Sequence, residues 1–112
     1  MIPADPYVAY QHCALCPREC GVDRSAGKVG ICGESAELRV ASLEAHFGEE
    51  PPLSGSCGSG TLFLSGCSLL CTFCQNFQIS GLHLGAIVGV EQIATRILEL
   101  VRQQKIHNLN LV

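Results

Sequence analysis

The sequence has no excess of positive charge, no long apolar run and few charged residues, and each absence excludes a class of protein. Its 112 residues carry 7 Lys plus Arg against 10 Asp plus Glu, a formal net charge of −3, which argues against a dedicated nucleic-acid binder. No apolar stretch approaches the ~20 residues of a membrane-spanning helix. Charged residues are 15% and hydrophobic residues 47% of the chain, a balance that argues against intrinsic disorder.

The N-terminus also lacks an export signal. Residues 1–6 read Met-Ile-Pro-Ala-Asp-Pro and contain neither a basic n-region nor an apolar h-region. We therefore expect a cytoplasmic protein whose thiols stay reduced. The chain contains 8 cysteines, well above ordinary usage, and in a reducing compartment clustered thiols favour metal binding. Four disulfides are the alternative if the protein is exported by another route.

The cysteines form two groups separated by a Gly-Ser-rich stretch at residues 54–60. The N-terminal cysteine block comprises Cys13, Cys16, Cys20 and Cys32. The cysteine trio comprises Cys67, Cys71 and Cys74, and Cys57, between the groups, is interpreted as a free thiol. We place the domain boundary here, so that residues 1–56 form a cysteine-rich segment with a possible metal knuckle and residues 57–112 form a second unit.

The second unit has the pattern of one βαβ unit. The short apolar run at residues 61–65 suits a buried parallel strand, and alternation at residues 108–111 predicts another strand. Between them, helical spacing of apolar residues predicts an amphipathic helix over residues 90–105. A further short strand is expected at residues 38–43. The predicted fold class is therefore α/β, a first βαβ unit truncated within its second strand; a complete small domain stapled by metal is the alternative.

The trio has the spacing C-x3-C-x2-C in a loop directly after an apolar strand. A closed zinc site needs four protein ligands, and an electron-transfer cubane usually has four cysteines. Three cysteines would leave one iron of a [4Fe–4S] cluster open to a substrate or cofactor. A zinc site completed by Cys57 or His83 is the alternative. The four histidines show no paired ligand spacing and are interpreted as solvated.

The trio, with Phe73 just before its last cysteine, resembles the radical S-adenosylmethionine (SAM) superfamily. Residues 58–80 around the trio and the block at residues 13–24 are similar to the pyruvate formate-lyase activating enzyme-related branch. The resemblance covers roughly residues 13–112. It implies a partial TIM-like (βα) barrel with the cluster loop after its first strand. It also implies a [4Fe–4S] cluster on the trio, SAM on the fourth iron, and Phe73 near the adenine; simple packing beside the cluster is the alternative for Phe73.

The implied activity is reductive cleavage of SAM to a 5′-deoxyadenosyl radical that abstracts hydrogen, with no catalytic side chain assigned. The implied partners are SAM, an electron donor such as flavodoxin or ferredoxin, and a protein substrate such as a glycyl radical enzyme; no nucleic acid or membrane is expected. The family's Gly-Gly-Glu-type segment is not present, so we expect this chain to be an incomplete N-terminal part without SAM cleavage of its own. A non-catalytic zinc-binding module and a small iron–sulfur electron-transfer protein are the alternatives.

The N-terminal cysteine block supplies four possible ligands, enough for a zinc site or an auxiliary iron–sulfur cluster. The spacing does not match the bacterial ferredoxin run, which weakens the case for an auxiliary cluster. Free thiols are the alternative. A metal here would stabilise a segment that has little apolar core.

Overall fold

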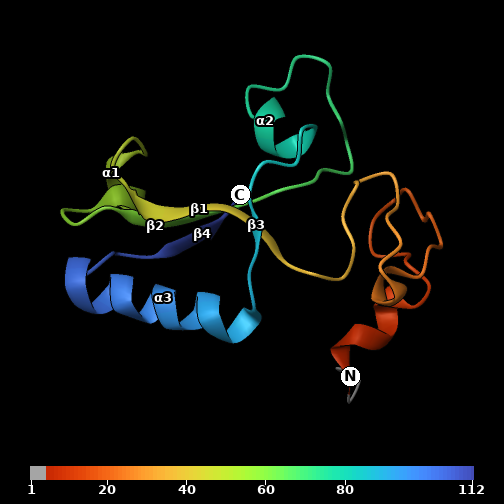
Figure 1. Ribbon diagram of the computed structural model, residues 1–112. Coiled ribbons are helices and arrows are strands. Elements are labelled where there is room, and N and C mark those ends of the chain that lie inside the picture. The colour runs from red at the N-terminus through yellow and green to blue at the C-terminus, as the bar shows by residue number, and fades with distance from the viewer. Residues whose placement is uncertain (1–4) are drawn as a thin grey trace.

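The structure is a computed structural model that describes residues 5–112 (Figure 1). Two 3-10 helices come first, followed by strands and helices in the order β1, α1, β2, α2, β3, α3 and β4. Their bounds are Pro6–Tyr10 and Arg24–Ala26 for the 3-10 helices, then Arg39–His46, Pro51–Ser54, Ser59–Leu64, Phe77–Ser80, Ala86–Ile87, Val90–Gln104 and Leu109–Leu111. Among the described residues, no helix has the length and apolar character needed to cross a membrane.

The strands form one mixed sheet in the order β3-β1-β2-β4. β1 pairs antiparallel with β2, with Leu43 opposite Leu62, and also antiparallel with β3. β2 and β4 are parallel, with Gly60 opposite Leu109. The predicted start of a TIM-like barrel is therefore wrong. A barrel needs repeated parallel βα units, whereas within residues 5–112 the sheet has one parallel pair and is otherwise antiparallel.

The prediction failed because β1 was read as a short strand among loops. It is an eight-residue strand that forms the longest pairing in the sheet. Residues 47–58, which contain only the one-turn helix α1, reverse the chain between β1 and β2. A reversal of this kind produces antiparallel neighbours, because parallel neighbours need a crossover that returns to the starting end of the sheet. The crossover exists only between β2 and β4, where it includes α3.

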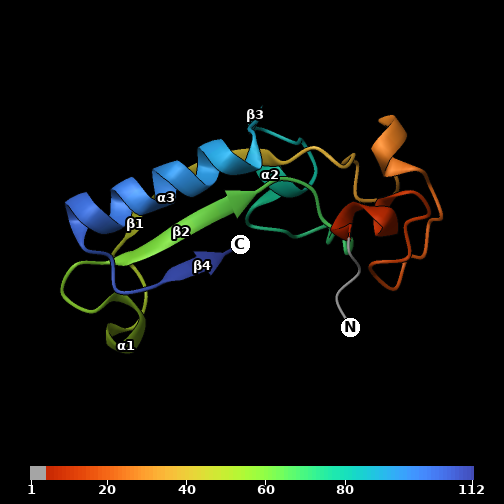
Figure 2. The same cartoon turned by 90° about the horizontal axis from the view of Figure 1, so that it is seen from below.

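The core lies between α3 and one face of the sheet (Figures 1 and 2). Its buried members are Val40 of β1, Leu62 of β2 and Ile93 of α3, flanked by the partly buried Leu38, Leu43, Leu64, Val88 and Ile97. α3 ends within one residue of the predicted position. Its apolar stripe is only partly covered, since Val90 and Leu98 remain more than half exposed. The core is therefore small.

The described residues before β1 contain neither a strand nor an α-helix. Only Cys13 and Glu34 are buried among them. Figure 2 shows the arrowhead of β2 pointing toward this N-terminal segment, with the loop that follows β2 between the two. The fold thus brings the two cysteine groups to the same end of the sheet.

Candidate metal centre

The cysteine trio lies in the loop at residues 65–76, between β2 and α2. The chain enters this loop through Gly66, whose φ of 89° lies in the left-handed region. A Cβ at Gly66 would collide with the Glu34 side chain and approach the Cys32 carbonyl oxygen to 3.0 Å. Glycine is therefore required here both for the turn and for the close approach of the N-terminal segment.

The Cys67 sulfur accepts a hydrogen bond from its own loop. The donor is the Leu69 N–H, whose nitrogen lies 3.4 Å from Cys67 Sγ. Leu70 adopts a φ of 54°, the left-handed conformation that turns the loop back on Cys67. The N–H groups of Leu70 and Leu69 lower the pKa of the Cys67 thiol. A lowered pKa favours the thiolate, which is the form that binds metal.

The other two members of the trio lie within the same loop. The Cys74 N–H donates to the Cys71 carbonyl oxygen at 3.3 Å, which closes a turn between them. The Ser80 hydroxyl donates to Cys74 Sγ at 3.3 Å, whereas Cys71 is exposed. Phe73, predicted to contact the adenine, has 89% of its surface exposed and is not part of a packed core. The loop therefore exposes Cys71 and Phe73 to solvent, whereas Cys67 and Cys74 are half-buried.

No three His, Cys, Asp or Glu side chains within residues 5–112 come close enough to hold a single metal ion. Thiolates around one zinc ion lie about 3.8 Å apart, as follows from a tetrahedron with Zn–S of about 2.3 Å. A cubane binds each cysteine to a different iron, so its ligand sulfurs stay further apart. The alternative zinc site is not assembled either. Cys57 lies at the opposite end of β2 from the trio, and His83 Nδ1 pairs with Glu34 Oε1 at 2.7 Å.

Arg18 joins the N-terminal segment to the trio loop. Its Nε donates to the Ser68 carbonyl oxygen at 2.7 Å and its Nη2 to the Leu69 carbonyl oxygen at 3.3 Å. Both carbonyls lie between Cys67 and Cys71. No motif in the sequence could have revealed this contact between residues 50 positions apart.

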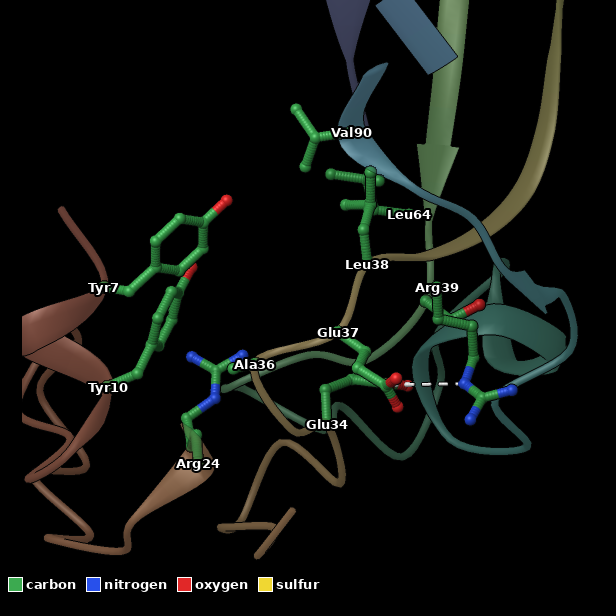
Figure 3. Close-up of a pocket in the computed structure, with 11 residues that line it drawn as sticks. Tyr7, Tyr10, Arg24, Glu34, Ala36, Glu37, Leu38, Arg39, Leu64 and Val90 are labelled. Carbon is green, nitrogen blue, oxygen red and sulfur yellow. Dashed lines mark hydrogen bonds and ion pairs between the residues drawn. The ribbon is translucent and has the colours of Figure 1, made fainter. Parts of the chain in front are cut away.

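Glu34, in the N-terminal segment, links this segment to β1 and to the residues after α2. This buried carboxylate pairs with Arg39 Nε at 3.3 Å and with His83 Nδ1 at 2.7 Å. Figure 3 shows it at a cavity of about 280 Å³ between the N-terminal segment and the end of the sheet. On the far wall, Arg24 stacks over Tyr10, with its Cζ 4.6 Å from the ring centroid. His83, interpreted from the sequence as solvated, is half-buried and pairs with Glu34.

The N-terminal cysteine block is not assembled as a metal site within residues 5–112. Cys13 is buried, and Arg24 Nη1 lies 3.9 Å from its sulfur. The Leu15 N–H, more than Arg24 or Cys20, lowers the pKa of the Cys13 thiol, against the opposing effect of burial. Cys16 and Cys32 are half-buried. None of the 8 cysteines, all within the described residues, forms a disulfide.

No family model matches the chain, and no solved structure matches it. Over 74 residues, 66% of this chain, it is 34% identical to the uncharacterized protein MJ0674 of Methanocaldococcus jannaschii. The matched stretch is 20% of that protein, so the chain spans about a fifth of the length of the curated relative it matches.

Proposed function

We propose that this chain is part of a radical SAM iron–sulfur protein in which Cys67, Cys71 and Cys74 hold a [4Fe–4S] cluster. The observation that carries the proposal is the three-cysteine loop at the end of β2, in which the Leu69 N–H donates to Cys67 Sγ at 3.4 Å. Three thiolate ligands leave one iron for SAM. Cytoplasmic location belongs to the same proposal.

The chemistry supplied at such a site is one-electron reduction of SAM by the cluster, which breaks a carbon–sulfur bond to give methionine and a 5′-deoxyadenosyl radical for hydrogen abstraction. The electron comes from a donor such as flavodoxin or ferredoxin, and a glycyl radical enzyme is the type of substrate expected. The chain's own residues bind and orient. The Leu70 and Leu69 N–H groups lower the pKa of Cys67 and so favour its thiolate, the Ser80 hydroxyl orients Cys74, and Phe73 offers a face for the adenine.

The test is anaerobic reconstitution with iron and sulfide, followed by metal analysis and EPR of the reduced protein. We expect a brown protein with about four irons per chain and an EPR signal that changes when SAM is added. Cys67→Ala, Cys71→Ala and Cys74→Ala should each lose the cluster. Cys57→Ala is the matched control and should retain it, because Cys57 lies at the other end of β2.

Two other results would replace this proposal with its alternatives. A colourless protein that contains zinc but no iron identifies a non-catalytic zinc-binding module. A cluster whose EPR signal does not change when SAM is added identifies an electron-transfer protein. We expect negligible release of 5′-deoxyadenosine from the isolated 112-residue chain, so EPR rather than turnover is the readout.

A further inference from the structure

Strand β1 has a free edge along most of its length. One edge pairs with β2 from Val40 to His46, whereas the other pairs with β3 only at Arg39 and Val40. Within the described residues, no strand other than β3 lies on this second edge. Alternate backbone N–H and C=O groups of residues 42–46 therefore have no strand partner on that side. Because the pairing with β2 is regular over residues 42–46, this edge is a template for a further strand.

A groove runs along this edge, between β1 and α3. Its first part is a hollow of about 510 Å³ that meets four consecutive residues of β1, Val40 to Leu43. Consecutive side chains of a strand point to opposite faces, so a hollow that meets all four residues lies at the edge of the strand. Figure 2 shows α3 lying along the β1 side of the sheet, away from β4, which places the helix beside this edge.

The groove has an apolar floor and one charged side chain. Val40 and Ile93 of the buried core form the floor, and the partly buried Val88 lies beside them. Arg96 of α3 also lines the hollow and is exposed. No carboxylate of residues 5–112 pairs with its guanidinium. The groove therefore combines an apolar surface with a positive charge that has no ion-pair partner in the described chain.

The groove continues along α3 as a second hollow of about 230 Å³, which reaches Gln104. Leu43 and Arg96 line both hollows and so join them into one groove. From Ile93 to Gln104, α3 extends about 17 Å at the helical rise of about 1.5 Å per residue. An extended segment of about five residues has the same length. The groove is therefore long enough for a short strand.

We propose that this groove binds an extended peptide segment of a partner protein, which adds a strand to the free edge of β1. Backbone groups of residues 42–46 hydrogen-bond the peptide, and its alternate apolar side chains fill the hollow over Val40 and Ile93. A carboxylate on the same face of the peptide pairs with Arg96. β3 already uses this edge at Arg39 and Val40, so the edge accepts a strand in the folded chain. This inference goes beyond the proposed function and does not depend on it, because it uses none of the cysteines.

The test measures peptide binding to the full 112-residue chain by fluorescence anisotropy, under reducing conditions with EDTA. The probe is an end-blocked, fluorescein-labelled peptide of alternating Val and Thr, with Glu in place of one central Val. We expect saturable binding, which Lys in place of that Glu should weaken roughly two- to fivefold. A peptide with Pro at two Val positions should not bind, because Pro cannot donate to a strand partner.

Charge exchange identifies the groove as the binding site. Arg96→Glu should invert the order of affinities, so that the Lys peptide binds more tightly than the Glu peptide. Arg102→Glu is the matched control, because Arg102 is another exposed arginine of α3 but does not line the groove. It should leave the order unchanged.

Amide hydrogen exchange shows which edge of the sheet the peptide uses. The Glu peptide should slow exchange of amides within residues 42–46 and leave those of β4, at the opposite edge, unchanged. The proposal is overturned if no peptide binds saturably, if Arg96→Glu keeps the original order of affinities, or if protection appears at β4 instead. It is equally overturned if sedimentation and exchange show that the chain dimerises through residues 42–46, because a second copy then occupies the edge.

Discussion

The guanidinium of Arg18 donates to the carbonyl oxygen of Ser68 over 2.7 Å, a contact between residues 50 positions apart. A second donor of Arg18, Nη2, hydrogen-bonds the carbonyl oxygen of the next residue, Leu69, so one guanidinium binds two successive peptide groups of the trio loop. The N–H groups that lower the pKa of Cys67 belong to Leu70 and Leu69, the residues that follow these two carbonyls in the chain. The geometry makes Arg18 a positioning residue for the loop.

We therefore expect Arg18→Ala to weaken retention of the cluster on the trio. Hydrogen bonds from a charged donor contribute about 1.5–3 kcal/mol when sheltered and less when exposed. If this exposed pair of hydrogen bonds stabilises the loop by about 1 kcal/mol, its loss should make iron removal by a chelator roughly fivefold faster. Arg18→Lys should rescue only part of the effect, because an ammonium lacks the planar fork that reaches both carbonyls. Lys28→Ala is the control. If Arg18→Ala loses iron no faster than Lys28→Ala, Arg18 does not position the loop.

The lowered pKa of Cys67 predicts how its reactivity depends on pH. The Leu70 and Leu69 N–H groups stabilise the thiolate, so the thiol loses its proton at a lower pH than an ordinary cysteine, which titrates at about 8.5. In metal-free, reduced protein, alkylation of Cys67 by iodoacetamide should rise with pH and reach half its maximum below that value. Peptide mass spectrometry follows the single residue. The same cysteine in urea-unfolded chain is the reference, and an equal midpoint in both states would refute the prediction.

The sequence was sufficient to predict the elements whose pattern is local. The helical spacing from Val90 to Val101 predicted α3 to within a residue at its end, and the alternation around Leu109 predicted β4. The partner of β1 was not predictable in this way, because antiparallel pairing with β2 depends on how residues 47–58 turn. Pattern reasoning identifies an element but does not fix its neighbour.

The candidate metal centre was likewise predictable only in its local features. The trio was evident from spacing alone, whereas the residues that hold its loop come from distant segments. Arg18 and Glu34 carry ordinary surface types of side chain, and only the fold shows that one grips the loop and the other packs on Gly66. Cys20 beside Gly30 is a similar case, since nothing in a single sequence marks that glycine as a contact.

Glu34 should matter more for stability than its residue type suggests. It is buried and pairs with both Arg39 and His83, so Glu34→Ala leaves two polar partners without their acceptor. We expect a loss of about 1–3 kcal/mol in the free energy of unfolding, measured by urea denaturation in one fixed metal state. Glu37→Ala is the matched control because Glu37 is exposed at the same cavity, and it should change stability by less than about 0.5 kcal/mol. Equal effects of the two substitutions would show that the buried pairing contributes nothing.

The small core predicts unusual sensitivity at Leu62. This side chain is 5% exposed and packs with Val40 and Ile93, the other two buried members of the cluster between the sheet and α3. Leu-to-Ala changes in cores cost about 2–5 kcal/mol, and small domains are stable by only about 5 kcal/mol, so Leu62→Ala should be close to unfolded at 25 °C. Leu111 lies opposite Leu62 in the parallel pairing of β2 with β4, but it is 67% exposed. Leu111→Ala should therefore shift the urea midpoint little. If Leu62→Ala and Leu111→Ala unfold at the same urea concentration, packing between α3 and the sheet is not the main source of stability. Bound metal would then be the main stabilising contribution.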